Sequence, residues 1–161
     1  MADTTEINPY LRTKILTASP AELRLMLIEG AIKFARQGRD AMSAKNYEGV
    51  YENLTKSKDI ILELINGLRH EIEPEICANL ERLYTFMYRR LMDASLEKNT
   101  TIIDEVIDLL DYDRETWVLL MRQVAGERKK GASVEDTPAP GRLAGVGAGS
   151  SGERGGFSVE G

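Results

Sequence analysis

Apolar residues recur at helical spacing along four stretches of similar length, and this pattern is what most limits how the chain can fold. The stretches cover about residues 19–44, 46–68, 74–98 and 99–126. Because an α-helix rises about 1.5 Å per residue, each stretch would form a helix roughly 33–39 Å long. No stretch shows the sustained apolar–polar alternation of a strand. Four helices of matched length joined by short loops predict an all-α fold, an antiparallel up-down four-helix bundle.

The first of these helices has the clearest start signal. Ser19 can accept a hydrogen bond from free backbone N–H groups, Pro20 suits the first helical position, and Glu22 completes a capping box. Asn46 is expected to cap the second helix, and Pro74 is expected to open the third. The helix boundaries are therefore predicted from local chemistry as well as from periodicity.

The ionisable and sulfur-containing residues exclude several classes of function. A formal net charge of −5 argues against a nucleic-acid partner, which needs a concentrated basic face. The single cysteine, Cys77, cannot form an intramolecular disulfide, and the single histidine, His70, cannot supply the paired Glu-x-x-His motifs of metal sites in bundles. No run of residues is apolar and long enough for membrane insertion, and the first thirty residues lack a secretion signal. We expect a cytoplasmic, non-enzymatic protein without a cofactor or metal site.

Composition divides the chain into three parts. Residues 131–161 contain nine of the 14 glycines, so they cannot bury enough apolar surface to offset the entropy of ordering. We predict that this Gly-rich tail is disordered. Residues 19–130 would form the four-helix bundle, and residues 1–18 a short N-terminal segment packed on the bundle over a groove.

The first helix is apolar on two sides, which is more than a helix of an isolated bundle requires. On a helical wheel one side, which we assign to the core, comprises Leu23, Met26, Leu27, Gly30, Phe34 and Ala41. The nearly opposite side carries Leu25, Ile28 and Ile32, which we expect to face outward. Each of these three side chains would lose about 1.5–3 kcal/mol in water relative to full burial. We therefore expect something to cover them.

Three occupants could cover this outward face. They are the chain's own N-terminal segment, a second copy in a homodimer, and an amphipathic helix of another protein bound in a groove. The other apolar residues that we expect to contribute to the contact are Ile7, Tyr10 and Leu11 in the N-terminal segment and the off-core residues Ile60, Leu64 and Phe86 in the second and third helices.

The N-terminal third of the chain carries specific motifs, Asn8-Pro9-Tyr10-Leu11, then Thr17-Ala18-Ser19-Pro20-Ala21-Glu22-Leu23 and Met26-Leu27-Ile28-Glu29-Gly30-Ala31-Ile32. Further motifs follow at Lys45-Asn46-Tyr47, Lys56 to Leu64, Tyr84 to Leu91, and Arg114 with Trp117. Together they resemble the flagellar export chaperone family FliS over about residues 7–125. Ile28 and Glu29 stand where that family usually has tyrosine and aspartate, so a hydroxyl is lost and the acidic charge is kept.

The resemblance implies a four-helix bundle that binds the C-terminal segment of newly made flagellin in the cytoplasm and blocks its premature polymerisation. The bundle would deliver the subunit to the flagellar type III export gate, which includes FlhA. The resemblance also implies that Ile7, Tyr10 and Leu11 form an internal plug, which the client displaces. The alternative is a structural homodimeric bundle or a regulatory interaction module with no export client.

Overall fold

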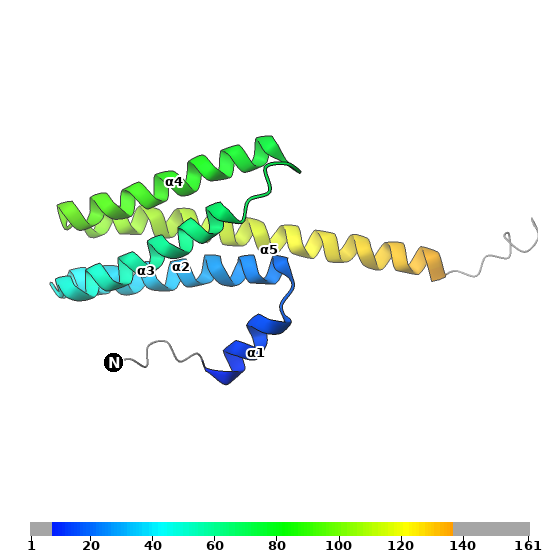
Figure 1. The fold of residues 1–161 in the computed structure, drawn as a ribbon, viewed down its shortest axis with the longest axis horizontal. Coiled ribbons are helices and arrows are strands. Elements are labelled where there is room, and N and C mark those ends of the chain that lie inside the picture. Colours follow the sequence, from blue (N-terminus) through cyan, green and yellow to red (C-terminus); the bar gives the residue numbers. More distant parts are fainter. Residues whose placement is uncertain (1–7, 137–161) are drawn as a thin grey trace, which may run out of the picture. The chain divides into compact units, whose positions relative to one another are not determined.

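The computed structural model describes residues 8–136, with side chains as far as residue 131, and the fold is all-helical. The helices are α1 (Pro9–Thr17), α2 (Pro20–Ser43), α3 (Tyr47–Asn66), α4 (Pro74–Glu97) and α5 (Thr100–Asp136) (Figure 1). Residues 8–136 contain no strand. The chain divides into two compact units, Met1–Met121 and Arg122–Gly161. The bundle and α1 belong to the first unit, and the described part of the second is helical.

Local chemistry sets the helix ends, as the sequence predicts. The backbone N–H of Glu22 donates to Ser19 Oγ at 3.1 Å, and the backbone N–H of Ser19 donates to Glu22 Oε1 at 2.8 Å, which completes the capping box. Asn46 caps α3 by accepting from the backbone N–H of Gly49 at 3.1 Å. Helix α4 begins at Pro74 and ends where Lys98 adopts a left-handed conformation, with φ of 53°.

Contacts between helices of the first unit establish their directions. Ser57 Oγ of α3 donates to the carbonyl oxygen of Ala31 in α2 at 2.9 Å, whereas Gly38, later in α2, faces Leu54, earlier in α3. These two helices are therefore antiparallel. The same reversal relates α2 to α5 and α4 to α5 through the hydrogen-bonded pairs Arg36–Asp111, Trp117–Ala21, Tyr84–Asp113 and Arg90–Glu105. The predicted up-down four-helix bundle is confirmed.

Small residues allow α2 and α3 to pack closely. Ala31, Ala35 and Gly38 are all buried on the face of α2 that meets α3. A Cβ atom on Gly38 would lie only 2.6 Å from Leu54 Cδ2, so any larger residue at this position would force the Leu54 side chain to move. The fully buried side chains of the bundle core include Ile28, Leu54, Ile61, Met87, Leu91, Ile103, Val106 and Leu110.

The two ends of the chain differ from the sequence-based expectation. The N-terminal segment contains a helix, α1, which the periodicity did not predict; Asn8 caps it by accepting from the backbone N–H of Tyr10 at 2.7 Å. Helix α5 continues to Asp136 instead of ending near Gly126, because no helix-breaking proline occurs before Pro138. The rest of the expected disordered tail, 137–161, lies outside the described residues.

Candidate functional site

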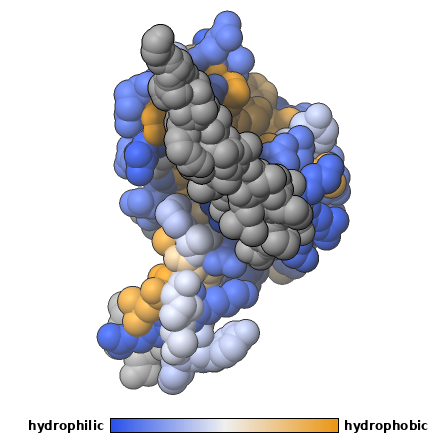
Figure 2. All heavy atoms as spheres, turned by 90° about the vertical axis from the view of Figure 1, so that its right-hand side faces the viewer, coloured by the Kyte–Doolittle hydropathy of each residue, from blue (hydrophilic) through white to orange (hydrophobic). Residues whose placement is uncertain are grey.

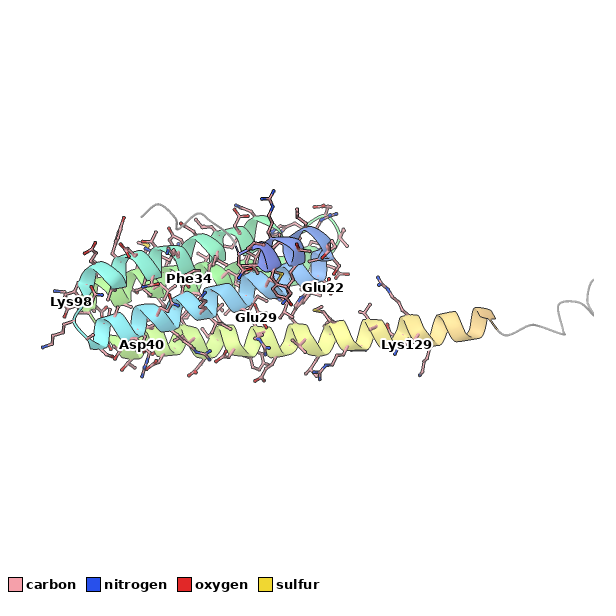
Figure 3. The ribbon with its side chains drawn as sticks, turned by 90° about the horizontal axis from the view of Figure 1, so that it is seen from below. Glu22, Glu29, Phe34, Asp40, Lys98 and Lys129 are labelled. Carbon is pink, nitrogen blue, oxygen red and sulfur yellow. The ribbon has the colours of Figure 1, made fainter. Side chains whose placement is uncertain are left out.

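An apolar groove lies between α1 and the N-terminal half of α2. It encloses about 580 Å³. The residues that line it are Leu11, Lys14 and Ile15 from α1 and Leu23, Met26, Leu27, Glu29, Gly30, Lys33 and Phe34 from α2. In Figure 3, where Glu22, Glu29, Phe34 and Asp40 are labelled along α2, the residues of α2 that line the groove begin just after Glu22 and end at Phe34. We name it the α2 groove.

The structure reverses the predicted roles of the two apolar sides of α2. Ile28 is fully buried, Ile32 is 4% exposed, and both belong to the bundle core, so the prediction that they face outward is wrong. Leu25 is partly buried and does not line the groove. The side assigned to the core, which includes Leu23 and Phe34, supplies the floor of the α2 groove instead.

A signal in the sequence could have distinguished the two sides. A helical wheel gives the angle between two apolar stripes but does not say which stripe meets the neighbouring helices. The stripe with Ile28 and Ile32 also carries Ala31, Ala35 and Gly38, whose small size allows α3 to approach. The groove stripe carries long side chains, with Gly30 as its smallest member. Small residues therefore marked the side that faces the bundle.

The N-terminal residues expected at the contact lie in different places. Leu11 lines the α2 groove and is 40% exposed, whereas Tyr10 is 74% exposed and is not one of the lining residues. Ile15, which sequence reasoning missed, lines the groove from the next turn of α1. Ile7 lies outside the described residues. Whether these residues contact a partner stays a prediction.

The three residues of α3 and α4 that we expected at the partner contact also lie in different places. Ile60 packs partly buried beside the groove, since its Cδ1 atom lies 3.3 Å from where a Cβ on Gly30 would be. Leu64 is fully buried in the core, so its off-core assignment is wrong, although it lines a second cleft described next. Phe86 is half-exposed on α4 and lines another cavity, with Arg82 and Arg89.

A second cleft, of about 400 Å³, adjoins the α2 groove, because Leu23 and Leu27 line both. We name it the end cleft, since it lies where α2 begins and α3 ends. Its other lining residues are Pro20, Ala21, Arg24, Glu63, Leu64, Gly67, Arg69 and Trp117. Apolar patches interrupt a mainly hydrophilic surface in the space-filling view as well (Figure 2).

A polar network holds one wall of the end cleft in place. Arg24 Nη2 donates to Tyr84 Oη at 2.7 Å, and Tyr84 Oη in turn donates to Asp113 Oδ2 at 2.6 Å. The Arg24 guanidinium carbon lies 5.6 Å from the Tyr84 ring centroid and 5.4 Å from that of Trp117. Trp117 Nε1 donates to the carbonyl oxygen of Ala21 at 3.0 Å. The network therefore joins α2, α4 and α5 and fixes the Arg24 side chain.

The Tyr84 phenol is fully buried, and this predicts how the stability of the bundle responds to high pH. Burial raises the pKa of Tyr84 well above its ordinary value of 10.0, and the Asp113 carboxylate raises it further. Stability from the neutral phenol is therefore present below pH 10.0 and lost as the pH rises above that value.

We expect Tyr84→Phe to lower the free energy of unfolding at pH 7 by about 1–3 kcal/mol and to weaken the decline of that free energy above pH 10.0. Urea denaturation across this pH range measures both effects, with Tyr51→Phe, at an exposed position, as the control; an unchanged high-pH slope in the Tyr84 variant would contradict the assignment.

Charged side chains border the α2 groove. The Lys33 and Lys56 ammonium nitrogens lie 5.5 and 5.3 Å from the Phe34 ring centroid. Glu29 is held by an ion pair with Arg114 of α5 at 2.9 Å. The groove therefore combines an apolar floor with a mainly basic rim around Phe34, which suits an amphipathic helix with acidic residues on its polar side.

Metal-binding clusters and membrane-spanning helices are both absent from the part of the chain that the structure describes. Within residues 8–136, no group of three or more histidine, cysteine, aspartate or glutamate side chains is placed to hold a metal ion. Across the same part of the chain, no helix combines the length and apolar character needed to cross a bilayer. The candidate site consists of two adjoining concavities with mainly apolar linings, the α2 groove and the end cleft.

Comparison with known proteins identifies the family. A family model described as "Flagellar protein FliS" matches residues 3–124. The flagellar secretion chaperone FliS of Bacillus subtilis is 35% identical over 76% of this chain and 90% of that protein. Its namesake in Salmonella typhimurium is 34% identical over 66% and 80%, and that in Vibrio cholerae is 32% identical over 65% and 77%. The chain therefore belongs to the FliS family of flagellar secretion chaperones.

Proposed function

We propose that this chain is a cytoplasmic export chaperone for flagellin. Its α2 groove binds the amphipathic C-terminal segment of flagellin and so prevents premature polymerisation. The chaperone then delivers the subunit to the flagellar type III export apparatus, where FlhA receives it. The observation that carries the proposal is the apolar groove along α2, which is covered by one short helix of the same chain.

Helix α1 covers the groove with few buried contacts, and this supports the proposal. Helix α1 has nine residues and no buried side chain, and Leu16 is 73% exposed. A helix of this length is only marginally stable by itself in water. A longer amphipathic client can therefore displace α1 by burying more apolar surface on the same floor.

The floor of the groove fits the client chemistry. Leu23, Leu27, Gly30 and Phe34 follow one another at i, i+4, i+7 and i+11, so they form one continuous stripe along α2. An amphipathic helix binds such a stripe through apolar anchors at the same spacing. A free flagellin terminus would otherwise expose those anchors to water, and binding repays the few kcal/mol that ordering the client requires.

Deleting residues 1–16 tests the displaceable cover. We expect the truncated chain to bind a synthetic flagellin C-terminal peptide about tenfold more tightly, because no internal segment competes for the groove. Isothermal titration calorimetry measures the affinity, and deletion of residues 137–161 is the control. Unchanged or weaker binding after removal of residues 1–16 would contradict the plug. Sedimentation of the complex should give one peptide per chain, whereas a homodimer that excludes the peptide would favour the structural alternative.

A further inference from the structure

The end cleft is positively charged as well as apolar. Arg24 and Arg69 line it together with one acidic residue, Glu63. Among the side chains described in residues 8–131, no carboxylate lies within 4.0 Å of either arginine's guanidinium nitrogens. Within the described part of the chain, the cleft therefore holds two guanidinium groups without a direct ion pair, beside Leu64 and Trp117.

Arg24 is held in a fixed orientation. The Tyr84 and Trp117 rings lie against its guanidinium, and one of its nitrogens donates to the Tyr84 hydroxyl. Its hydrogen-bond partner is a neutral phenol, because the raised pKa of Tyr84 keeps that group protonated. The charge of Arg24 is thus positioned without being neutralised by the group that positions it. A guanidinium fixed in this way loses little further entropy when it binds a carboxylate.

We propose that the end cleft captures the terminal α-carboxylate of the client's C-terminal segment. Arg24 and Arg69 would bind the carboxylate, and the last apolar side chain would pack on Leu64 and Trp117. This inference rests on the proposed function, in which the client is a C-terminal segment. Such a segment ends in a carboxylate whatever its sequence, and the end cleft adjoins the groove that holds the segment's apolar anchors.

Helix α1 leaves the end cleft open. The residues that line this cleft come from α2, α3, the turn that follows α3, and α5, whereas α1 residues line the α2 groove. The terminal carboxylate can therefore bind while α1 still covers the groove. Capture of the terminus then raises the effective concentration of the remaining client segment beside α2 and favours displacement of α1.

Two forms of one peptide test the inference. A tryptophan-free flagellin C-terminal peptide is prepared as the free acid and as the C-terminal amide, and each is titrated into the full chain by calorimetry. We expect amidation to weaken binding about tenfold, because it removes a charge-assisted contact. Trp117 is the chain's single tryptophan and lines the cleft, so its fluorescence should change on binding of the free acid more than of the amide.

Arginine variants show whether the difference arises in the end cleft. The double variant Arg24→Gln, Arg69→Gln should bind the acid and the amide equally, whereas Arg89→Gln on α4 should preserve the tenfold difference. If the double variant loses its helical circular dichroism, Arg69→Gln alone, at an exposed position, should reduce the difference to about threefold.

The outcomes separate this inference from the proposed function. Equal binding of acid and amide by the wild-type chain would overturn terminal capture while leaving the chaperone function intact. A tenfold difference that persists in the arginine variants would also overturn it, because the carboxylate would then bind elsewhere. If neither peptide form binds, the proposed function fails, and the inference fails with it.

Discussion

Replacing Ile28 with aspartate is expected to unfold the bundle. Ile28 is fully buried in the core, so the new carboxylate would be transferred from water into an apolar interior without a cationic partner. An uncompensated buried charge costs about 3–5 kcal/mol, and the lost side chain adds about 2–5 kcal/mol by comparison with other core truncations. Because domains of this size are stable by only about 5–15 kcal/mol, most or all of the native state should be lost.

Circular dichroism and urea denaturation measure this loss, with Leu23→Asp as the matched control. Leu23 is an apolar residue of the same helix, but it lines the α2 groove, and an aspartate in the first turn is favoured by the helix dipole. Ile28→Asp should have the far-ultraviolet spectrum of a largely unfolded chain, whereas Leu23→Asp should remain helical. A helical Ile28→Asp variant with native stability would show that the assignment of this face to the core is incorrect.

Placing two carboxylates on the floor of the α2 groove is expected to abolish flagellin binding while preserving the fold. The double variant Leu23→Asp, Met26→Asp removes two apolar contacts, each worth about 1.5–3 kcal/mol when buried. It also places two charges where the apolar anchors of the client would lie. Calorimetry with the flagellin C-terminal peptide should therefore show affinity reduced at least about 100-fold.

The same pair of substitutions on another surface provides the control. Met92 and Leu96 of α4 are 42% and 80% exposed and lie outside both the α2 groove and the end cleft. Met92→Asp, Leu96→Asp should leave the affinity for the peptide unchanged. If this control weakens binding as much as the groove variant does, the client contacts α4 as well, and the α2 groove is not sufficient to explain binding.

The bundle could be predicted from the sequence because its determinants are local. Ser19, Glu22 and Asn46 cap helices through residues three positions away, and the apolar periodicity is continuous along each helix. Helix α1 was missed because it is short and weakly amphipathic, so its nine residues produce little periodic signal.

The site could be predicted only in part because its contacts are long-range. Both apolar stripes of α2 were recognised, but hydrophobicity on the wheel does not say which stripe meets α3. The residues that indicate this side, Ala31, Ala35 and Gly38, do so by their small size. The wall of the end cleft joins Arg24 to Tyr84 and Trp117, which lie far apart in the sequence. No local pattern indicates such a network, because each of its members is also an ordinary helical residue.

The capping box at the start of α2 has a consequence for how α1 and a client would exchange in the proposed function. Ser19 and Glu22 satisfy each other's backbone groups, so the first turn of α2 takes no hydrogen bond from α1. Ala18 and Ser19, both in extended conformation, separate the two helices. Departure of α1 would therefore break only side-chain contacts with α2, and α2 would stay helical from its first residue. In the proposed function, loading and release would therefore need no helix melting, only rotation of α1 about the two-residue link Ala18–Ser19.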